Sequence, residues 1–221
     1  MQTPVPLPAV VRLAPGVSAR VVAVARVTRA GADIAALRGP LQQFFGNTVS
    51  VGILKQCDDL VLLSLTALRD AITAFGITPE RQAGWGVVAN PRRAGQARMT
   101  ETITKFLTNG AWSVSPHVIP HCLLHSLSGI LSQALALNGP NMGVGGVPDT
   151  EEDVCLGMAA WLAGEDATGG WMVWAGWQND NPEGPDAVGE ALVAAVEYTG
   201  EPADGETGWR AIDRLAPRGT P

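Results

Sequence analysis

Five apolar runs with little polar interruption occur along the chain and predict buried strands. The first is rich in valine (residues 19–28, ARVVAVARVT), and shorter ones follow at 84–89, 142–147, 171–177 and 191–198. Their length of six to ten residues and their content of valine and tryptophan favour strands over helices. Such continuous apolar runs are typical of buried strands.

A helical period follows the first strand. In residues 58–75 the apolar side chains recur at i, i+3 and i+4, which is typical of an amphipathic helix. Asp58 or Asp59 would cap its first turn, and Gly76 would end it. The apolar positions are Leu60, Leu63, Ala67, Leu68, Ala71, Ile72 and Phe75.

Three more helices are predicted further along. A short one covers residues 100–107, and Pro120 suits the first position of a helix that runs to residue 137. A third helix, at 150–163, has carboxylates at its N-terminal end, where the helix dipole favours them. Strands that alternate with helices indicate an α/β fold, with a mostly parallel or mixed sheet and helices packed on it.

Composition narrows the functional classes. The chain has 221 residues, 46% of them hydrophobic, and a net charge of −6. This charge argues against nucleic acid as a partner, because phosphate binding needs clustered lysine and arginine. The N-terminal residues do not read as a secretory signal, and no apolar run reaches the ~20 residues of a membrane span. Three widely spaced cysteines fit reduced thiols, so we expect a cytoplasmic protein without a membrane partner.

Residues 115–149 carry the most specific motif, SPHVIPHCLLHSLSGILSQALALNGPNMGVGGVPD. An S-P-x-x-x-P turn opens a helix there, and an L-x-G-P-N turn leads into a strand. This order resembles the approach to the active site of a β-ketoacyl synthase. Weaker similarities in the family's order extend over residues 18–198. The resemblance implies the N-terminal half of a thiolase-like fold at 18–198, preceded by an extended arm at 1–17 and followed by a tail at 199–221.

The resemblance fails at the reactive residues. In the family the strand ends in T-A-C-[AST]-S-G, whose cysteine takes the acyl chain as a thioester. Family spacing places Pro148 at that cysteine, and a proline side chain has no nucleophile. The two catalytic histidines of the family belong to its second half, beyond the similarity. The residues therefore predict no catalytic group and no cofactor.

A ketosynthase frame without its nucleophile resembles the chain-length factors, which pair with an active ketosynthase. The resemblance implies a full-length ketosynthase or a second copy as partner, and an acyl carrier protein through that complex. It also implies a dimer strand with Met142, Val144 and Val147. An acyl tunnel would be lined by the side chains His125, Ser128 and Trp161. The pathway would be fatty acid, polyketide or aryl polyene synthesis.

Other readings of these residues stay open. The chain could be a stand-alone acyl-binding or regulatory module, or an enzyme acting on thioesters through an unrecognised site. His117, His121 and His125 follow one another at spacings of four, which allows a metal site as an alternative to packing or capping. Cys155 reads as an inert buried thiol, since no histidine lies near it in sequence.

Overall fold

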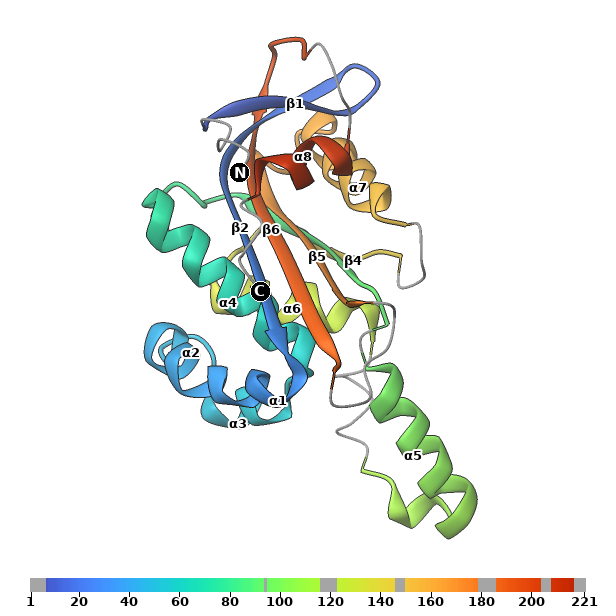
Figure 1. The fold of residues 1–221 in the computed structure, drawn as a ribbon. Coiled ribbons are helices and arrows are strands. Elements are labelled where there is room, and N and C mark those ends of the chain that lie inside the picture. Colours follow the sequence, from blue (N-terminus) through green and yellow to red (C-terminus); the bar gives the residue numbers. More distant parts are fainter. Residues whose placement is uncertain are drawn as a thin grey trace.

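The structure of the chain, a computed structural model, describes residues 7–93, 95–115, 123–145, 150–178, 186–203 and 208–216. One mixed sheet of six strands forms its centre, in the order β1-β2-β6-β5-β3-β4. The strands β3, β4 and β5 are mutually parallel, while β6 runs antiparallel to β2 and β5. Helices cover both faces of the sheet (Figure 1). The predicted α/β class with a mixed sheet is confirmed. The strand bounds are β1 Ala9–Ala14, β2 Val17–Ala30, β3 Trp85–Pro91, β4 Asn141–Gly143, β5 Gly169–Trp177 and β6 Val188–Thr199.

Two hydrophobic clusters lie on opposite faces of the sheet, and β5 shows how the sequence creates them. Trp171 and Val173 point into the first cluster, whereas Met172 and Trp174 point into the second. Successive side chains of a strand alternate between the faces, so a run that is apolar at every position needs cover on both sides. Helices α4 (Asp59–Phe75) and α6 (Leu124–Ala134) pack on the first face. On the second face lie α7 (Glu152–Ala163) and α8 (Trp209–Leu215).

Helix α4 forms as its sequence predicts. The Asp58 side chain accepts a hydrogen bond from the Leu60 N–H at 2.9 Å and caps the first turn. Gly76 ends the helix with a left-handed φ of 63°, which glycine adopts without a steric penalty. The side chains of Leu60, Leu63 and Leu68 are fully buried between the helix and β2, β5 and β6.

Several elements differ from the sequence predictions. Strand β4 has three described residues, although a longer run was predicted there. Helix α5 (Gln96–Asn109) extends beyond the predicted 100–107, and α6 begins at Leu124. Residues 116–122 and 146–149 lie outside the described part of the chain, so the predicted starts and ends there stay predictions.

The sequence patterns missed seven elements. Four short helices form a layer beside α4 (Figure 1). Their bounds are α1 Gly31–Ile34, η1 Ala35–Leu37, α2 Arg38–Phe45 and α3 Val51–Gln56. Strand β1 lies in the segment assigned to an arm, and α8 lies in the segment assigned to a tail; both contribute to the second cluster. A further short helical turn, η2 (Ala111–Ser113), follows α5. No described helix combines the length and the hydropathy that crossing a membrane requires.

Candidate functional site

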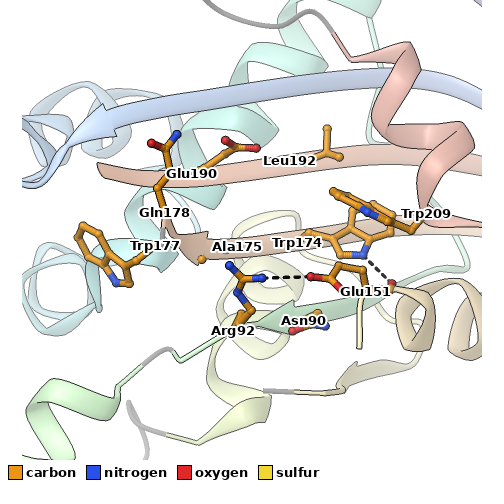
Figure 2. A pocket seen from close by; sticks show the side chains of 11 residues that line it. Asn90, Arg92, Glu151, Trp174, Ala175, Trp177, Gln178, Glu190, Leu192 and Trp209 are labelled. Carbon is orange, nitrogen blue, oxygen red and sulfur yellow. Dashed lines mark hydrogen bonds and ion pairs between the residues drawn. The ribbon is translucent and has the colours of Figure 1, made fainter. Parts of the chain in front are cut away.

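A pocket of about 170 Å³ lies where β3 and β5 end, next to the start of α7 (Figure 2). Asn90 and Arg92 come from the end of β3, and Glu151 immediately precedes α7. In open sheets of parallel strands, the carboxyl ends of the strands and the starts of the following helices form the usual binding crevice. The remaining lining residues are Trp174, Ala175, Gly176, Trp177, Gln178, Glu190, Leu192 and Trp209.

Polar contacts tie the end of β3 to the segment before α7. The Asn90 amide donates to the Thr150 carbonyl oxygen at 2.8 Å and to Thr150 Oγ1 at 3.1 Å. Arg92 Nη1 donates to Glu151 Oε1 at 3.3 Å, and the Arg92 N–H donates to the Ala175 carbonyl oxygen at 2.8 Å. These bonds fix the backbone at the entrance to α7 relative to the sheet.

Indole rings form the apolar walls of the pocket. The Trp174 Nε1–H donates to the Glu151 carbonyl oxygen at 2.8 Å, and its ring lies 4.8 Å from the ring of Trp209 on α8. Trp177 bounds the opposite end, and Leu192 lies between on β6 (Figure 2). The bond to the Glu151 carbonyl satisfies the one polar atom of the Trp174 ring.

The second carboxylate of the pocket is engaged by a guanidinium. Arg26 on β2 donates to Glu190 and to Asp213 of α8, and its side chain is 11% exposed. This arginine therefore joins β2, β6 and α8 through the Glu190 side chain of the pocket. Both carboxylates of the pocket, Glu151 and Glu190, are thus paired with arginines.

The described lining contains no hydroxyl, thiol, imidazole or amine side chain. Such groups are the usual nucleophiles of covalent catalysis. The arrangement can hold an apolar group against indoles and orient a polar one. The nucleophilic side-chain atoms of its described lining are the carboxylate oxygens of Glu151 and Glu190, both paired with arginines.

Cys155, one turn into α7, is not an alternative nucleophile. Its side chain is fully buried in the second cluster, and burial raises the pKa of its thiol far above the ordinary value, with Glu152 adding to the shift. Burial likewise raises the pKa of Cys57 to about 11. Since only the thiolate reacts, both residues behave as apolar packing groups.

We expect the native protein to resist thiol alkylation at both positions. At pH 8 a thiol with a pKa near 11 is ionised about 100-fold less than one at the ordinary value of 9.0, and steric protection adds to this. Iodoacetamide labelling with peptide mass spectrometry would measure the rates at Cys57 and Cys155 with and without denaturant. Native labelling of Cys155 within a factor of ten of the denatured rate would contradict its assignment as an inert thiol.

The structure separates the side chains predicted to line an acyl tunnel. His125 and Ser128 lie together on α6, with His125 Nδ1 and Ser128 Oγ 3.4 Å apart; Ser128 is buried and His125 is exposed. Trp161 lies on α7 and packs on the second cluster, across the sheet from α6. The three side chains therefore do not line one common cavity within this chain.

Of the residues predicted to form a dimer strand, two are described, and they lie in or directly after the edge strand β4. Met142 belongs to β4, and the Val144 N–H donates to the Ala89 carbonyl oxygen at 2.8 Å. Val147 and Pro148 lie outside the described residues, as do His117 and His121. Within the described ranges, no group of three or more histidine, cysteine or acidic side chains could hold a metal ion.

Solved structures of other proteins have a similar fold. The AntDE:AntF complex of a type II polyketide synthase, an acyl-carrier protein in complex with its ketosynthase bound to the hexaketide, matches with a TM-score of 0.59 at 11% identity, over 80% of this chain and 62% of that one. The ishigamide ketosynthase/chain length factor matches with a TM-score of 0.58 at 17% identity, over 80% of this chain and 61% of that one. The fold is that of the ketosynthases and chain-length factors.

The likeness is one of fold. No family model and no curated protein matches the sequence. The chain spans about three fifths of the length of each of these two structures.

Sequence reasoning did not find the residues that line the pocket. Arg92, Glu151 and Trp209 come from three separate elements, and none of them belongs to a motif. One signal was available: Arg92 follows shortly after a predicted strand, and Glu151 lies in the first turn of a predicted helix. Two such positions on neighbouring parallel units meet at the same end of a sheet.

Proposed function

We propose that this chain is a non-catalytic ketosynthase-like subunit that pairs with an active ketosynthase in polyketide synthesis. One observation carries the proposal: in a ketosynthase-like fold, the described lining of the pocket beside the start of α7 has no thiol, hydroxyl, imidazole or amine side chain to take an acyl group. The sequence agrees, because Pro148 stands where the resemblance places the family's cysteine.

The pocket supports a subunit more than a stand-alone acyl-binding module. Its volume of about 170 Å³ lies below the roughly 300–1,000 Å³ of most small-molecule sites. An acyl chain of a polyketide would need more room than this, so in our proposal the chain shapes a site that a second subunit completes.

Two unpartnered features favour a second subunit. In the described part of the chain β4 pairs only with β3, which leaves an open strand edge at Met142. On the outward side of α7, Leu156 is 53% exposed. An open strand edge and an exposed apolar helix face are both covered at low cost by another protein.

The two similar solved structures indicate which kind of protein the partner would be. One solved neighbour is a ketosynthase/chain length factor, and the other is a ketosynthase with its acyl-carrier protein. We propose a full-length ketosynthase as the first partner, and an acyl carrier protein reached through that complex. Self-association across β4 is the competing arrangement.

The test of the missing chemistry is acyl transfer followed by intact-protein mass spectrometry. The wild-type chain, incubated alone with an acyl-carrier thioester or cerulenin, is expected to gain no covalent adduct. Pro148→Cys is expected to gain at most thiol reactivity and no decarboxylative condensation, because one thiol does not supply the family's two histidines.

The control for this test is an active type II ketosynthase treated in parallel, which must become acylated. An acyl adduct on the wild-type chain would overturn the non-catalytic assignment. Condensation by Pro148→Cys alone would equally contradict it, since a base would then already be present.

A further inference from the structure

Helix α5 and the turn that follows it project from the body of the molecule (Figure 1). The base of the helix is anchored: the Gly95 N–H donates to Asp58 Oδ2 at 3.2 Å, and Arg98 Nη1 donates to the Gln56 carbonyl oxygen at 2.7 Å. From residue 103 to residue 113, every described residue is exposed. Within the described residues, the hydrogen bonds that tie this segment to the body lie at the base of α5.

One side of this projecting helix is apolar. Ile103, Phe106 and Leu107 are 51%, 50% and 76% exposed, and Trp112 in η2 is fully exposed at 101%. Spacings of three and four place the first three on one helix face, together with Met99. We call Met99, Ile103, Phe106, Leu107 and Trp112 the α5 stripe.

The opposite side of α5 is polar and internally satisfied. Lys105 forms an ion pair with Glu101 at 2.6 Å, and Thr104 and Thr108 donate to the carbonyl oxygens of Thr100 and Thr104. An apolar stripe opposite such a face is the pattern of a helix that packs on something. A helix of 14 residues is only marginally stable alone in water, so cover for the stripe would also stabilise the helix.

The position of α5 in the fold indicates which partner covers its apolar stripe. The helix emerges after the end of β3, the strand that pairs with the open-edged β4. Leu123 and Leu124, at the start of α6, are 52% and 45% exposed. They adjoin β4, because a Cβ on Gly143 would lie 2.1 Å from the Leu124 carbonyl oxygen. Exposed apolar groups thus extend from the edge of β4 to the start of α6. They lie beside β3, the strand that leads into α5.

The area that a stable interface needs also supports a subunit seated at β4 as the protein that covers the stripe. A stable interface buries roughly 800 Å² per partner, far more than a three-residue strand provides. Phe106 and Trp112 alone offer roughly 300 Å², since a buried aromatic side chain contributes roughly 150–250 Å². The stripe and the leucines of α6 supply much of the area that a subunit seated at β4 would need.

We propose that α5 is an arm that packs its stripe on the ketosynthase subunit lying against β4. This inference rests on the proposed function, because it assigns a second contact to the same partner. The strand edge sets the orientation of that subunit, and the arm supplies most of the apolar contact.

The test compares two single charges on the same helix. Leu107→Glu places a carboxylate in the stripe, and Thr104→Glu places one on the polar side. The ketosynthase encoded closest to this chain's gene serves as the probe, and Kd is measured by biolayer interferometry. We expect Leu107→Glu to weaken binding by about tenfold or more, as at the centre of an interface, and Thr104→Glu to change it less than about threefold. Trp112→Ala, which adds no charge, should also weaken binding by about tenfold.

Each other outcome is decisive. A wild type that does not bind the ketosynthase overturns the proposed function and the arm together. A wild type that binds, with Leu107→Glu and Trp112→Ala binding equally well, overturns the arm alone. If Leu107→Glu lowers the Tm of the isolated chain and Thr104→Glu does not, the stripe is covered within the chain and the arm is refuted. Weakened self-association or acyl-carrier binding, with ketosynthase binding unchanged, refutes the ketosynthase as occupant.

Discussion

Trp171→Ala is expected to lower the free energy of unfolding by about 3–5 kcal/mol, the range for removing a large aromatic side chain from a core. Trp171 is fully buried at the centre of β5, and its ring centroid lies 6.0 Å from that of Trp85. Its indole N–H donates to Gln82 Oε1 at 2.8 Å. Gln82 is itself buried, so the substitution leaves both a cavity and an unsatisfied acceptor.

Trp112→Ala is the matched control, because it removes the same side chain from a fully exposed position. It should change the free energy of unfolding by less than about 0.5 kcal/mol. Urea denaturation of the isolated variants, followed by circular dichroism, measures both values. Equal losses for the two variants would contradict the division into core and projecting arm.

Val144→Glu is expected to weaken association with a ketosynthase by about two to three orders of magnitude. Val144 lies at the end of β4 and is partly buried against the second cluster. In the proposed complex its side chain enters the subunit contact, where an unpaired carboxylate would lose its water. A cost of roughly 3–4 kcal/mol corresponds to this change in Kd.

Gln43→Glu controls for the added charge, because Gln43 is exposed on α2, in the helical layer beside α4. Its Kd should stay within about twofold of the wild type. The Tm of both variants must be measured as well, since Val144 also packs within the chain. Binding by Val144→Glu at the wild-type Kd would show that β4 is not the contact.

The elements that could be predicted from sequence are those whose signals are local. Helix α4 has a cap at Asp58, a left-handed stop at Gly76 and an apolar period between them, and its prediction is confirmed to within a residue. The apolar run at 171–177 likewise predicted a strand, and β5 covers it, with apolar side chains because both of its faces are buried.

The missed elements depend on tertiary packing. Helix α2 contains Gly39 and Pro40 in its first turn and has no side-chain cap, so its residues do not favour a helix alone. It forms because Leu41 and Phe45 are buried in the first cluster. Strand β1 follows a proline-rich stretch and is defined by its antiparallel pairing with β2.

The candidate site was predictable only in its location. The resemblance pointed to the segment before α7, and the pocket lies there. Its lining residues were not predictable, because Arg92, Trp174 and Trp209 come together only when three elements meet. The residues predicted to line a tunnel do not line this pocket. His125 and Trp161 lie on opposite faces of the sheet, and the sequence alone does not show which face each helix covers.

The most direct test of the central claim is light scattering of the wild-type chain at tens of micromolar, alone and mixed with the ketosynthase encoded closest to its gene. The account predicts a stable complex of the two proteins, at the summed mass of one copy of each or a multiple of it. A chain that stays monomeric in both samples would contradict its assignment as a ketosynthase-pairing subunit.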